Sequence, residues 1–252
     1  MTLNIPATER PLSASALKTA AFILMIINHA MYVLLPVIPG APAWVSQLHW
    51  FITRPSFVLF AFLTAEGVRH TRSVKNYLLR LFAMALISEI PFDLCIRGTL
   101  WSTDGQNVFF TLFLGAAAVY EMDRLRDDRT TQSMVLLGAC MAAVLLKSDY
   151  DATGVLLIAA MYFLRDDLKK CALVSLLILF FGTGLTVISG YLPGRILWDR
   201  VLYYAAMEAH GMLAFALIAL YNGKKGRQLP KPFYYSIYPV HLLIIAAIHL
   251  AG

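Results

Sequence analysis

Charged residues and cysteines are both scarce in this chain of 252 residues. Asp, Glu, Lys and Arg together make up 14% of it, whereas soluble domains carry about 25%. Its three cysteines, Cys95, Cys140 and Cys171, stand far apart. Isolated cysteines of this kind form neither a metal-binding spacing nor a disulfide framework, so we expect them to be small core hydrophobes. These scarcities argue against a soluble domain, a disulfide-rich protein and a metal site.

Motifs of several common enzyme classes are absent as well. The chain has no Walker loop, dinucleotide-binding fingerprint, zinc-binding helix or serine-nucleophile elbow. Hydride transfer and nucleotide hydrolysis therefore have no support in the sequence. No internal repeat is visible, although many transporters are built from repeats.

Apolar residues are abundant where charged residues are scarce. They make up 59% of the chain, and the mean hydropathy is +0.67. The first apolar run, residues 17–36, is longer than the ~7–15 residues of a signal-peptide core. We interpret it as an uncleaved first transmembrane helix. The composition thus predicts a membrane protein that crosses the bilayer many times.

A helix needs about 20 apolar residues to span a bilayer, and nine segments reach or come close to this length. They cover residues 17–36, 47–67, 76–96, 107–122, 132–146, 151–164, 170–190, 201–221 and 232–250. The fourth, fifth and sixth are the shortest. Since the connections are short, we predict an all-α, polytopic helical bundle of about nine transmembrane helices. Residues 1–252 would form a single integral membrane domain.

The loops between these segments alternate in charge. Sixteen of the 21 basic residues fall on one side: Arg10, Lys18, Arg69, Arg72, Lys75, Arg80, Arg124, Arg126, Arg129, Arg165, Lys169, Lys170, Lys224, Lys225, Arg227 and Lys231. The other five are Arg54, within a helix, and Arg97, Lys147, Arg195 and Arg200, on the opposite side. The positive-inside rule then places the N-terminus in the cytoplasm and the C-terminus outside. It also accounts for the net charge of +6 without a nucleic-acid partner, and we expect a multi-pass protein of the cell (inner) membrane.

Polar residues inside the predicted helices fall at one depth. His29, Arg54 and Glu89 each lie seven residues from the outer end of their segment, or ~10 Å below the surface at ~1.5 Å per residue. Glu208 lies at a similar level, and His210 and His241 lie slightly deeper. Since a charge at mid-membrane costs ~2.5–3.5 kcal/mol on insertion scales, this level predicts a polar site in the outer half of the bundle.

Arg54 and His29 are the main candidates within that site. Arg54 is either a structural partner of Glu89 or an electrophile that polarises a carbonyl group. His29 is either a hydrogen-bonded core residue or a group that takes and returns a proton near pH 7. Lys18 lies eleven residues before His29 on the same helical face. This spacing suits a ligand with a charged head at the cytoplasmic edge and its reactive tip at His29.

The other polar residues can each be interpreted as structural or as part of the site. Glu208 and His210 are two residues apart and point in nearly opposite directions, so only one of them faces the site. Tyr234, Tyr238, His241 and Ile245 form a stripe on the last helix, which is either packing or site. Asp149 either lines an outer vestibule or caps the next helix. Arg69 and Arg72 either bind phosphates or only set the topology.

Taken together, these residues resemble the TraX family of multi-pass membrane proteins, named for a conjugal-transfer protein that acetylates the N-terminus of pilin. The matching stretches are residues 17–20 with Asn28 and His29, 54–62, 77–81, 89–92, 107–110, 149–155, 220–224, and 233–242 with Tyr238, Pro239 and His241. They follow in order over nearly the whole chain. Two positions depart from the family pattern. Asn28 stands where an aspartate is usual, and Val58 replaces the proline of the Arg-x-x-Phe-Pro pattern that starts at Arg54.

The resemblance implies an acetyltransferase that moves an acetyl group from cytoplasmic acetyl-CoA to an amine or hydroxyl reached from the outer half of the membrane. The acceptor would be a small molecule or a peptide N-terminus. On this reading His29, Arg54, Glu89 and His241 are catalytic, and Lys18, Arg69 and Arg72 bind acetyl-CoA. Tyr238, Glu208, His210 and Asp149 would contact the acceptor. The alternatives are a proton-coupled small-molecule transporter, with buried histidines and carboxylates as relay groups, and a structural subunit.

Overall fold

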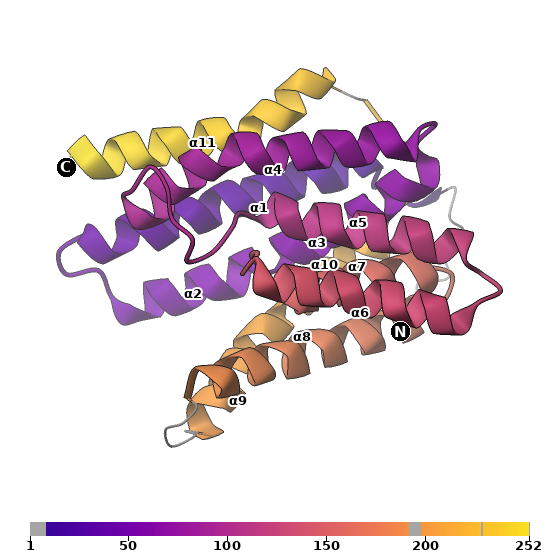
Figure 1. Cartoon of the computed structure of the whole chain (residues 1–252). Coiled ribbons are helices and arrows are strands. Elements are labelled where there is room, and N and C mark those ends of the chain that lie inside the picture. Colours follow the sequence, from indigo (N-terminus) through magenta and orange to yellow (C-terminus); the bar gives the residue numbers. More distant parts are fainter. Residues whose placement is uncertain (1–8, 192–197, 228, 252) are drawn as a thin grey trace.

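The computed structural model describes residues 9–191, 198–227 and 229–251 (Figure 1). Over these residues the chain is helical, and its only β-type pairings are two isolated bridges, Leu12 with Tyr221 and Gln106 with Ser148. The α-helices are α1 (Ala14–Leu34), α2 (Ala43–Thr53), α3 (Pro55–His70), α4 (Val74–Arg97), α5 (Val108–Arg124), α6 (Arg129–Leu145), α7 (Asp151–Phe163), α8 (Leu168–Tyr191), α9 (Trp198–Ala209), α10 (Ala214–Ile218) and α11 (Lys231–Ala251). Two short 3₁₀ helices are η2 (Leu35–Val37) and η3 (His210–Leu213). The predicted all-α class is confirmed.

Helices occur at every predicted segment, but fewer than nine of them have the length and composition of a membrane span. Within the described residues four helical stretches are long and apolar enough to cross a bilayer: Ala14–Val37, Ala43–His70, Trp198–Ile218 and Pro232–Ala251. The helices α6 and α7 are apolar but shorter. The sequence is therefore right about membrane helices, whereas the count of nine spans stays a prediction. Arg195, which we assigned to the outer side, lies outside the described residues.

The second predicted span is divided at Arg54. Pro55 has no N–H to donate into the preceding turn and its ring crowds that turn, which is the usual cause of a helix break. As a result α2 ends at Thr53 and α3 begins at Pro55. Arg54 is the single residue between the two helices and keeps a helical backbone conformation.

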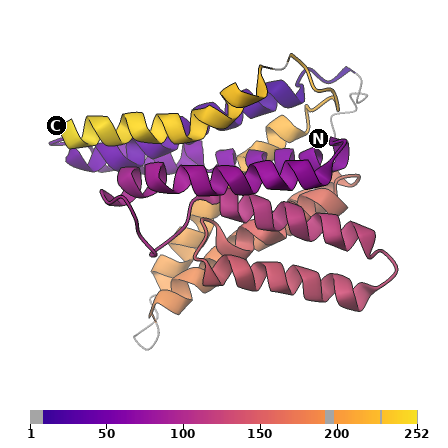
Figure 2. The same cartoon turned by 45° about the horizontal axis from the view of Figure 1, so that its top comes forward.

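The centre of the bundle is α3. Eleven of its 16 residues are buried, and it contacts α1, α5, α7, η3 and α10. Around it, α4 packs between α5 and α11, and α8 packs between α7 and α9 (Figures 1 and 2). The main core includes Leu17 of α1, Phe57 and Leu59 of α3, and Leu157 and Ile158 of α7.

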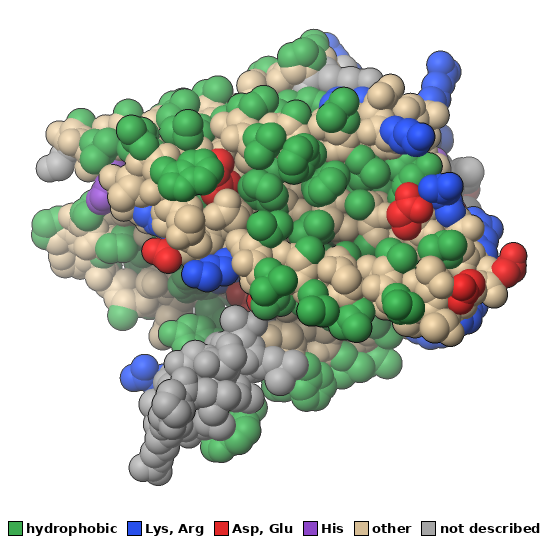
Figure 3. Space-filling view, viewed as in Figure 1, with side chains coloured by type: hydrophobic (Ala, Val, Ile, Leu, Met, Phe, Trp, Pro, Cys, Tyr) green, Lys and Arg blue, Asp and Glu red, His purple; other side chains and the backbone are tan. Residues whose placement is uncertain are grey.

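Basic side chains gather at one end of the bundle. Figure 3 shows most of the visible lysine and arginine side chains at the right-hand end, where α5 ends and α6 begins. We call this the basic end. It is the end that the loop charges assign to the cytoplasm, and α11 runs from it to the opposite end.

Candidate functional site

Two histidines from distant parts of the chain form a buried pair. His29 of α1 and His241 of α11 bring Nδ1 and Nε2 to 2.8 Å of each other, and their ring centroids are 5.0 Å apart. Only 9% of His29 and 6% of His241 is exposed. Both were predicted site residues, and the packing of α11 against α1 brings them together.

Hydrogen bonding assigns the tautomers of this pair. His241 Nδ1 lies 2.8 Å from the carbonyl oxygen of Ile237. Because a carbonyl oxygen can only accept, His241 Nδ1 carries the proton and its Nε2 is an acceptor. His29 must then donate from Nδ1, which leaves a lone pair on its Nε2. Within the described part of the chain the His29 ring has a hydrogen bond at Nδ1 only, so the lone pair on Nε2 has no described partner.

The predicted stripe on α11 does face α1. Tyr238 is buried, and its ring meets those of His29 and His241 edge-on, at 5.9 and 5.5 Å. Tyr234 lies one turn of α11 before Tyr238, towards the basic end. Lys18 Nζ of α1 lies 4.3 Å from the centre of the Tyr234 ring. Lys18 and His29 therefore share the face of α1 that packs on α11. Met25, which lies between them in sequence, is buried in the same core cluster as Tyr238.

Arg54 is the centre of a second group. Its Nη1 lies 2.8 Å from Glu208 Oε1 and donates to the Tyr150 hydroxyl at 3.2 Å, while the guanidinium lies over the Trp50 ring at 4.0 Å. Asp149 interacts electrostatically with the same guanidinium. The Nε of Arg54 is buried and has no hydrogen-bond partner in the described part of the chain. We call Arg54, Glu208, Tyr150, Asp149 and Trp50 the arginine cluster.

The suggested pairing of Arg54 with Glu89 is wrong. Glu89 of α4 instead accepts hydrogen bonds from the side chain of Asn107, at 2.5 Å, and from its backbone N–H, at 3.3 Å. Asn107 also caps α5 by accepting from Phe109 N–H. The two residues lie at the same predicted depth, but this does not make them partners, because Glu89 faces the start of α5 and Arg54 faces α9. In this structure Glu89 serves the α4–α5 contact, and its Oε1 is buried without a partner among the described residues.

The histidine pair and the arginine cluster are linked through neighbouring residues. Thr53, which precedes Arg54, donates its hydroxyl to Asn28 Oδ1 at 2.9 Å, and Asn28 precedes His29. His49 of α2 also approaches the Asn28 carbonyl oxygen, at 3.2 Å. Among the described residues no hydrogen bond or ion pair joins either histidine to Arg54. The α1–α2 contact thus fixes the two groups relative to each other without merging them.

Of the pair Glu208 and His210, only Glu208 belongs to the arginine cluster. His210 begins η3, and its ring meets the Phe51 ring edge-on at 4.8 Å. The two side chains thus have different partners, Arg54 for Glu208 and Phe51 for His210. His49, Trp50, Thr53 and Tyr150 were not among our predicted site residues. Tyr150 had a signal in the sequence, since it lies between Asp149 and Asp151.

The three residues assigned to acetyl-CoA are not gathered in one place. Lys18 is half-buried against Tyr234. Arg69 donates to the carbonyl oxygen of Tyr162 at 2.5 Å and lies 4.9 Å from the centre of the same residue's ring. Arg72 follows α3 and is exposed. All three belong to basic segments, yet Lys18 contacts α11 and Arg69 contacts α7.

Metal chemistry has no visible site in the residues that the structure describes, where no group of three or more His, Cys, Asp or Glu side chains is placed to hold an ion. The cysteines Cys95 and Cys171 are buried and Cys140 is half-buried, and all three are free thiols.

Comparison with known proteins identifies the family to which the chain belongs. A family model described as TraX protein matches residues 13–249. No curated protein and no solved structure matches the chain. Since the match covers nearly the whole chain, including both histidines and the arginine cluster, the chain belongs to the TraX family.

Proposed function

We propose that this protein is a membrane-embedded acetyltransferase that transfers an acetyl group from acetyl-CoA to an amine or hydroxyl acceptor. The observation that carries the proposal is the hydrogen-bond chain from the Ile237 carbonyl through His241 to His29. This chain leaves a proton-accepting nitrogen, His29 Nε2, on a rigid helix. A general base in a buried site is what activation of an amine or hydroxyl requires.

In the proposed reaction His29 Nε2 removes the proton from the acceptor as the acceptor attacks the thioester carbonyl. A bond forms between the acceptor atom and the acetyl carbon, and the carbon–sulfur bond breaks. The proton on His29 then passes to the departing thiolate of CoA. His241 Nε2 accepts from His29 Nδ1 throughout, so it holds the ring in the productive tautomer and stabilises the imidazolium that forms.

Arg54 suits the role of electrophile. Glu208 and Tyr150 hold its Nη1, which fixes the guanidinium while Nε stays without a partner among the described residues. A preorganised donor of this kind stabilises the oxyanion that develops on the thioester carbonyl. Tyr238 beside the histidines, and Asp149 and Glu208 beside Arg54, are the side chains that we propose contact the acceptor.

The direction of transfer follows from the charge pattern. Acetyl-CoA is a polyanion made in the cytoplasm, and the basic end is proposed to face that side. Acceptors would come from the outer half of a multi-pass protein in the cell membrane. Lys18 lies between the basic end and His29 on the face of α1 that packs on α11, and we retain it as a proposed contact for the charged part of acetyl-CoA.

The decisive experiment is incubation of the purified protein with acetyl-CoA labelled in the acetyl group. Acceptors would be a set of peptides with free N-termini and a matched set with blocked N-termini. Transfer of label to a free amine or hydroxyl, with release of CoA, supports the proposal. Absence of transfer, together with proton-coupled uptake of a small solute into proteoliposomes, would replace the enzyme by a transporter.

A further inference from the structure

An open groove of about 350 Å³ lies on the surface of α4, where this helix packs on α5. Four of its five lining residues are apolar: Leu78, Leu79 and Phe82 of α4, and Phe113 of α5. The fifth is Lys75, the second residue of α4. The groove is therefore an apolar surface with one ammonium group where the helix begins.

The lining residues of α4 follow one another along the helix axis. Lys75, Leu79 and Phe82 are separated by four and three residues, which places them on one face of α4. At ~1.5 Å rise per residue, the step from Lys75 to Phe82 covers ~10 Å. Because α4 starts at the basic end (Figure 1), the charge lies at that end and the apolar part extends towards the middle of the bundle.

The floor of the groove is part of the packed core. Leu78 and Phe113 are half-buried and pack against the main core cluster. The ring centroids of Phe82 and Phe113 are 5.2 Å apart, so these rings join the two helices. Leu79 and Phe82 are exposed at the rim. The groove thus belongs to the α4–α5 contact and is open on its outer side.

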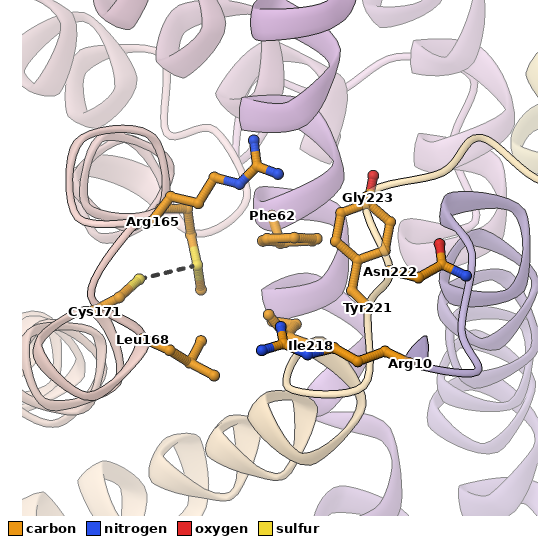
Figure 4. Close-up of a pocket in the computed structure, with 10 residues that line it drawn as sticks. Arg10, Phe62, Arg165, Leu168, Cys171, Ile218, Tyr221, Asn222 and Gly223 are labelled. Carbon is orange, nitrogen blue, oxygen red and sulfur yellow. Dashed lines mark hydrogen bonds between the residues drawn. The ribbon is translucent and has the colours of Figure 1, made fainter. Parts of the chain in front are cut away.

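Lys75 is exposed, and within the ranges that the structure describes its ammonium group has no hydrogen-bond or ion-pair partner. Other basic side chains of this end are occupied. Arg80 Nε donates to the Tyr235 hydroxyl at 3.1 Å. Arg165, in the lining of a smaller cavity at the same end (Figure 4), is paired with Glu66 at 2.7 Å. Lys75 is therefore a charge that can bind an anion from outside the chain.

The outer face of α4 is apolar over most of its length, and Figure 3 shows apolar side chains across this side of the molecule. After Asn76 every exposed residue of α4 is apolar: Leu79, Phe82, Leu86, Ile87 and Ile90. Its acidic residues, Glu89 and Asp93, are buried. The 24 residues of α4 extend over ~36 Å, and a bilayer core is about 30 Å thick. An exposed apolar face of this length is a surface that lipid chains cover.

We propose that the groove binds an anionic phospholipid of the cytoplasmic leaflet. The phosphate of the headgroup would lie against the Lys75 ammonium, and one acyl chain would lie along Leu79 and Phe82. Charge complementarity selects this occupant, because a soluble anion leaves the apolar part unused and a zwitterionic lipid brings no net charge to Lys75. The cytoplasmic leaflet carries the anionic lipids, and the loop charges assign the basic end to that side. The proposal is independent of acetyl transfer, since lipid binding is measured without any substrate.

The test is a lipid titration of the purified full chain in maltoside detergent, with native mass spectrometry to count bound lipids. The probes are phosphatidylglycerol and phosphatidylcholine with identical acyl chains, and glycerol phosphate as a headgroup without chains. We expect saturable binding of phosphatidylglycerol, severalfold tighter than binding of phosphatidylcholine, and no binding of glycerol phosphate at the same concentration. Equal affinity for the two lipids, or equal binding of glycerol phosphate, would overturn the proposal.

A lysine pair locates the charge. Lys75→Gln should lower the affinity for phosphatidylglycerol about fivefold and leave that for phosphatidylcholine unchanged. Lys169→Gln is the matched control, because Lys169 is likewise the exposed second residue of a helix, α8, but does not line the groove. A preference for phosphatidylglycerol that persists in Lys75→Gln, or that falls equally in Lys169→Gln, would contradict the assignment to this groove.

A leucine pair locates the acyl chain. Leu79→Ala should weaken binding of both lipids by a similar factor, because it shortens the apolar contact. Leu86→Ala, on the same helix and exposed but outside the groove, should leave both affinities in place. Unchanged lipid binding in Leu79→Ala would remove the acyl chain from the groove. A lipid-free dimer that Leu79→Ala dissociates would replace the lipid by a second copy of the chain.

Discussion

His29 Nδ1 lies 2.8 Å from His241 Nε2, although the two residues are 212 positions apart in the chain. The carbonyl oxygen of Ile237 on the far side of His241 fixes which nitrogen of each ring carries the proton. A pair of neutral histidines with a defined proton order is cheaper to bury than an isolated charge. It also leaves one basic nitrogen, on His29, for chemistry.

Replacement of His29 should abolish acetyl transfer without unfolding the protein. Loss of a general base costs about 10²–10⁴-fold in rate, and glutamine retains a donor towards His241. The rate is measured with labelled acetyl-CoA and a free-amine peptide. His249→Gln is the control, since His249 is exposed near the end of α11. Equal rates in the wild type and His29→Gln would remove His29 from the mechanism.

His241 should behave as a positioning residue. His241→Phe keeps a ring of similar shape but cannot accept from His29 Nδ1, so His29 is free to adopt the other tautomer. We expect a lower rate and a shifted pH dependence of kcat/KM, whereas a purely structural role would lower stability and leave the pH profile in place. The measurement is the rate between pH 5 and 9, with thermal unfolding recorded on the same samples.

Arg54 and Glu208 should be coupled in stability. Arg54→Gln leaves the Glu208 carboxylate, whose side chain is 16% exposed, without its partner, which should cost up to about 3 kcal/mol. Adding Glu208→Gln should restore the unfolding temperature, because neither charge then remains. Adding Glu89→Gln in its place should not, since Glu89 contacts Asn107. If Arg54 is the electrophile, the restored double variant stays inactive, and an active double variant would assign Arg54 to scaffolding alone.

A glycine in α7 should be intolerant of any side chain. A Cβ at Gly154 would meet Thr111 of α5 in a severe overlap and would lie 2.8 Å from the Phe57 ring of α3. Gly154→Ala should therefore destabilise the bundle by about 1–3 kcal/mol through overpacking. Gly138 of α6 has open space around the same position, so Gly138→Ala should be neutral or slightly stabilising. Comparison of the two unfolding curves checks both expectations.

Thiol labelling tests the proposed orientation of the chain in the membrane. In a variant lacking the three native cysteines, a cysteine at Lys224 should react with an impermeant maleimide only from the cytoplasmic side. A cysteine at Leu250, which is 64% exposed, should react only from the outer side. Reaction of both on one side would contradict the nine-span topology and the depth argument that rests on it.

The sequence by itself determined the class of the molecule. Helix formation and apolar length are local properties, and so every predicted segment contains a helix, and Pro55 marks where α2 gives way to α3. The burial of several polar residues could be predicted for the same reason. Burial of His29, Glu89 and His241 follows from their place within apolar runs. The charge pattern of the loops is also a property of the linear chain.

Only the tertiary structure decided which of these residues meet. Matched depth suggested Glu89 as the partner of Arg54, but depth gives one coordinate and leaves the rotation of each helix open. The packing of α9 and the loop before α7 around α3 brings Glu208 and Tyr150 to Arg54, and the packing of α11 on α1 brings His241 to His29. A small cavity at the basic end is likewise lined by residues of α3, α7, α8 and α10 together. Such contacts depend on how all helices pack at once, which no local pattern in the sequence encodes.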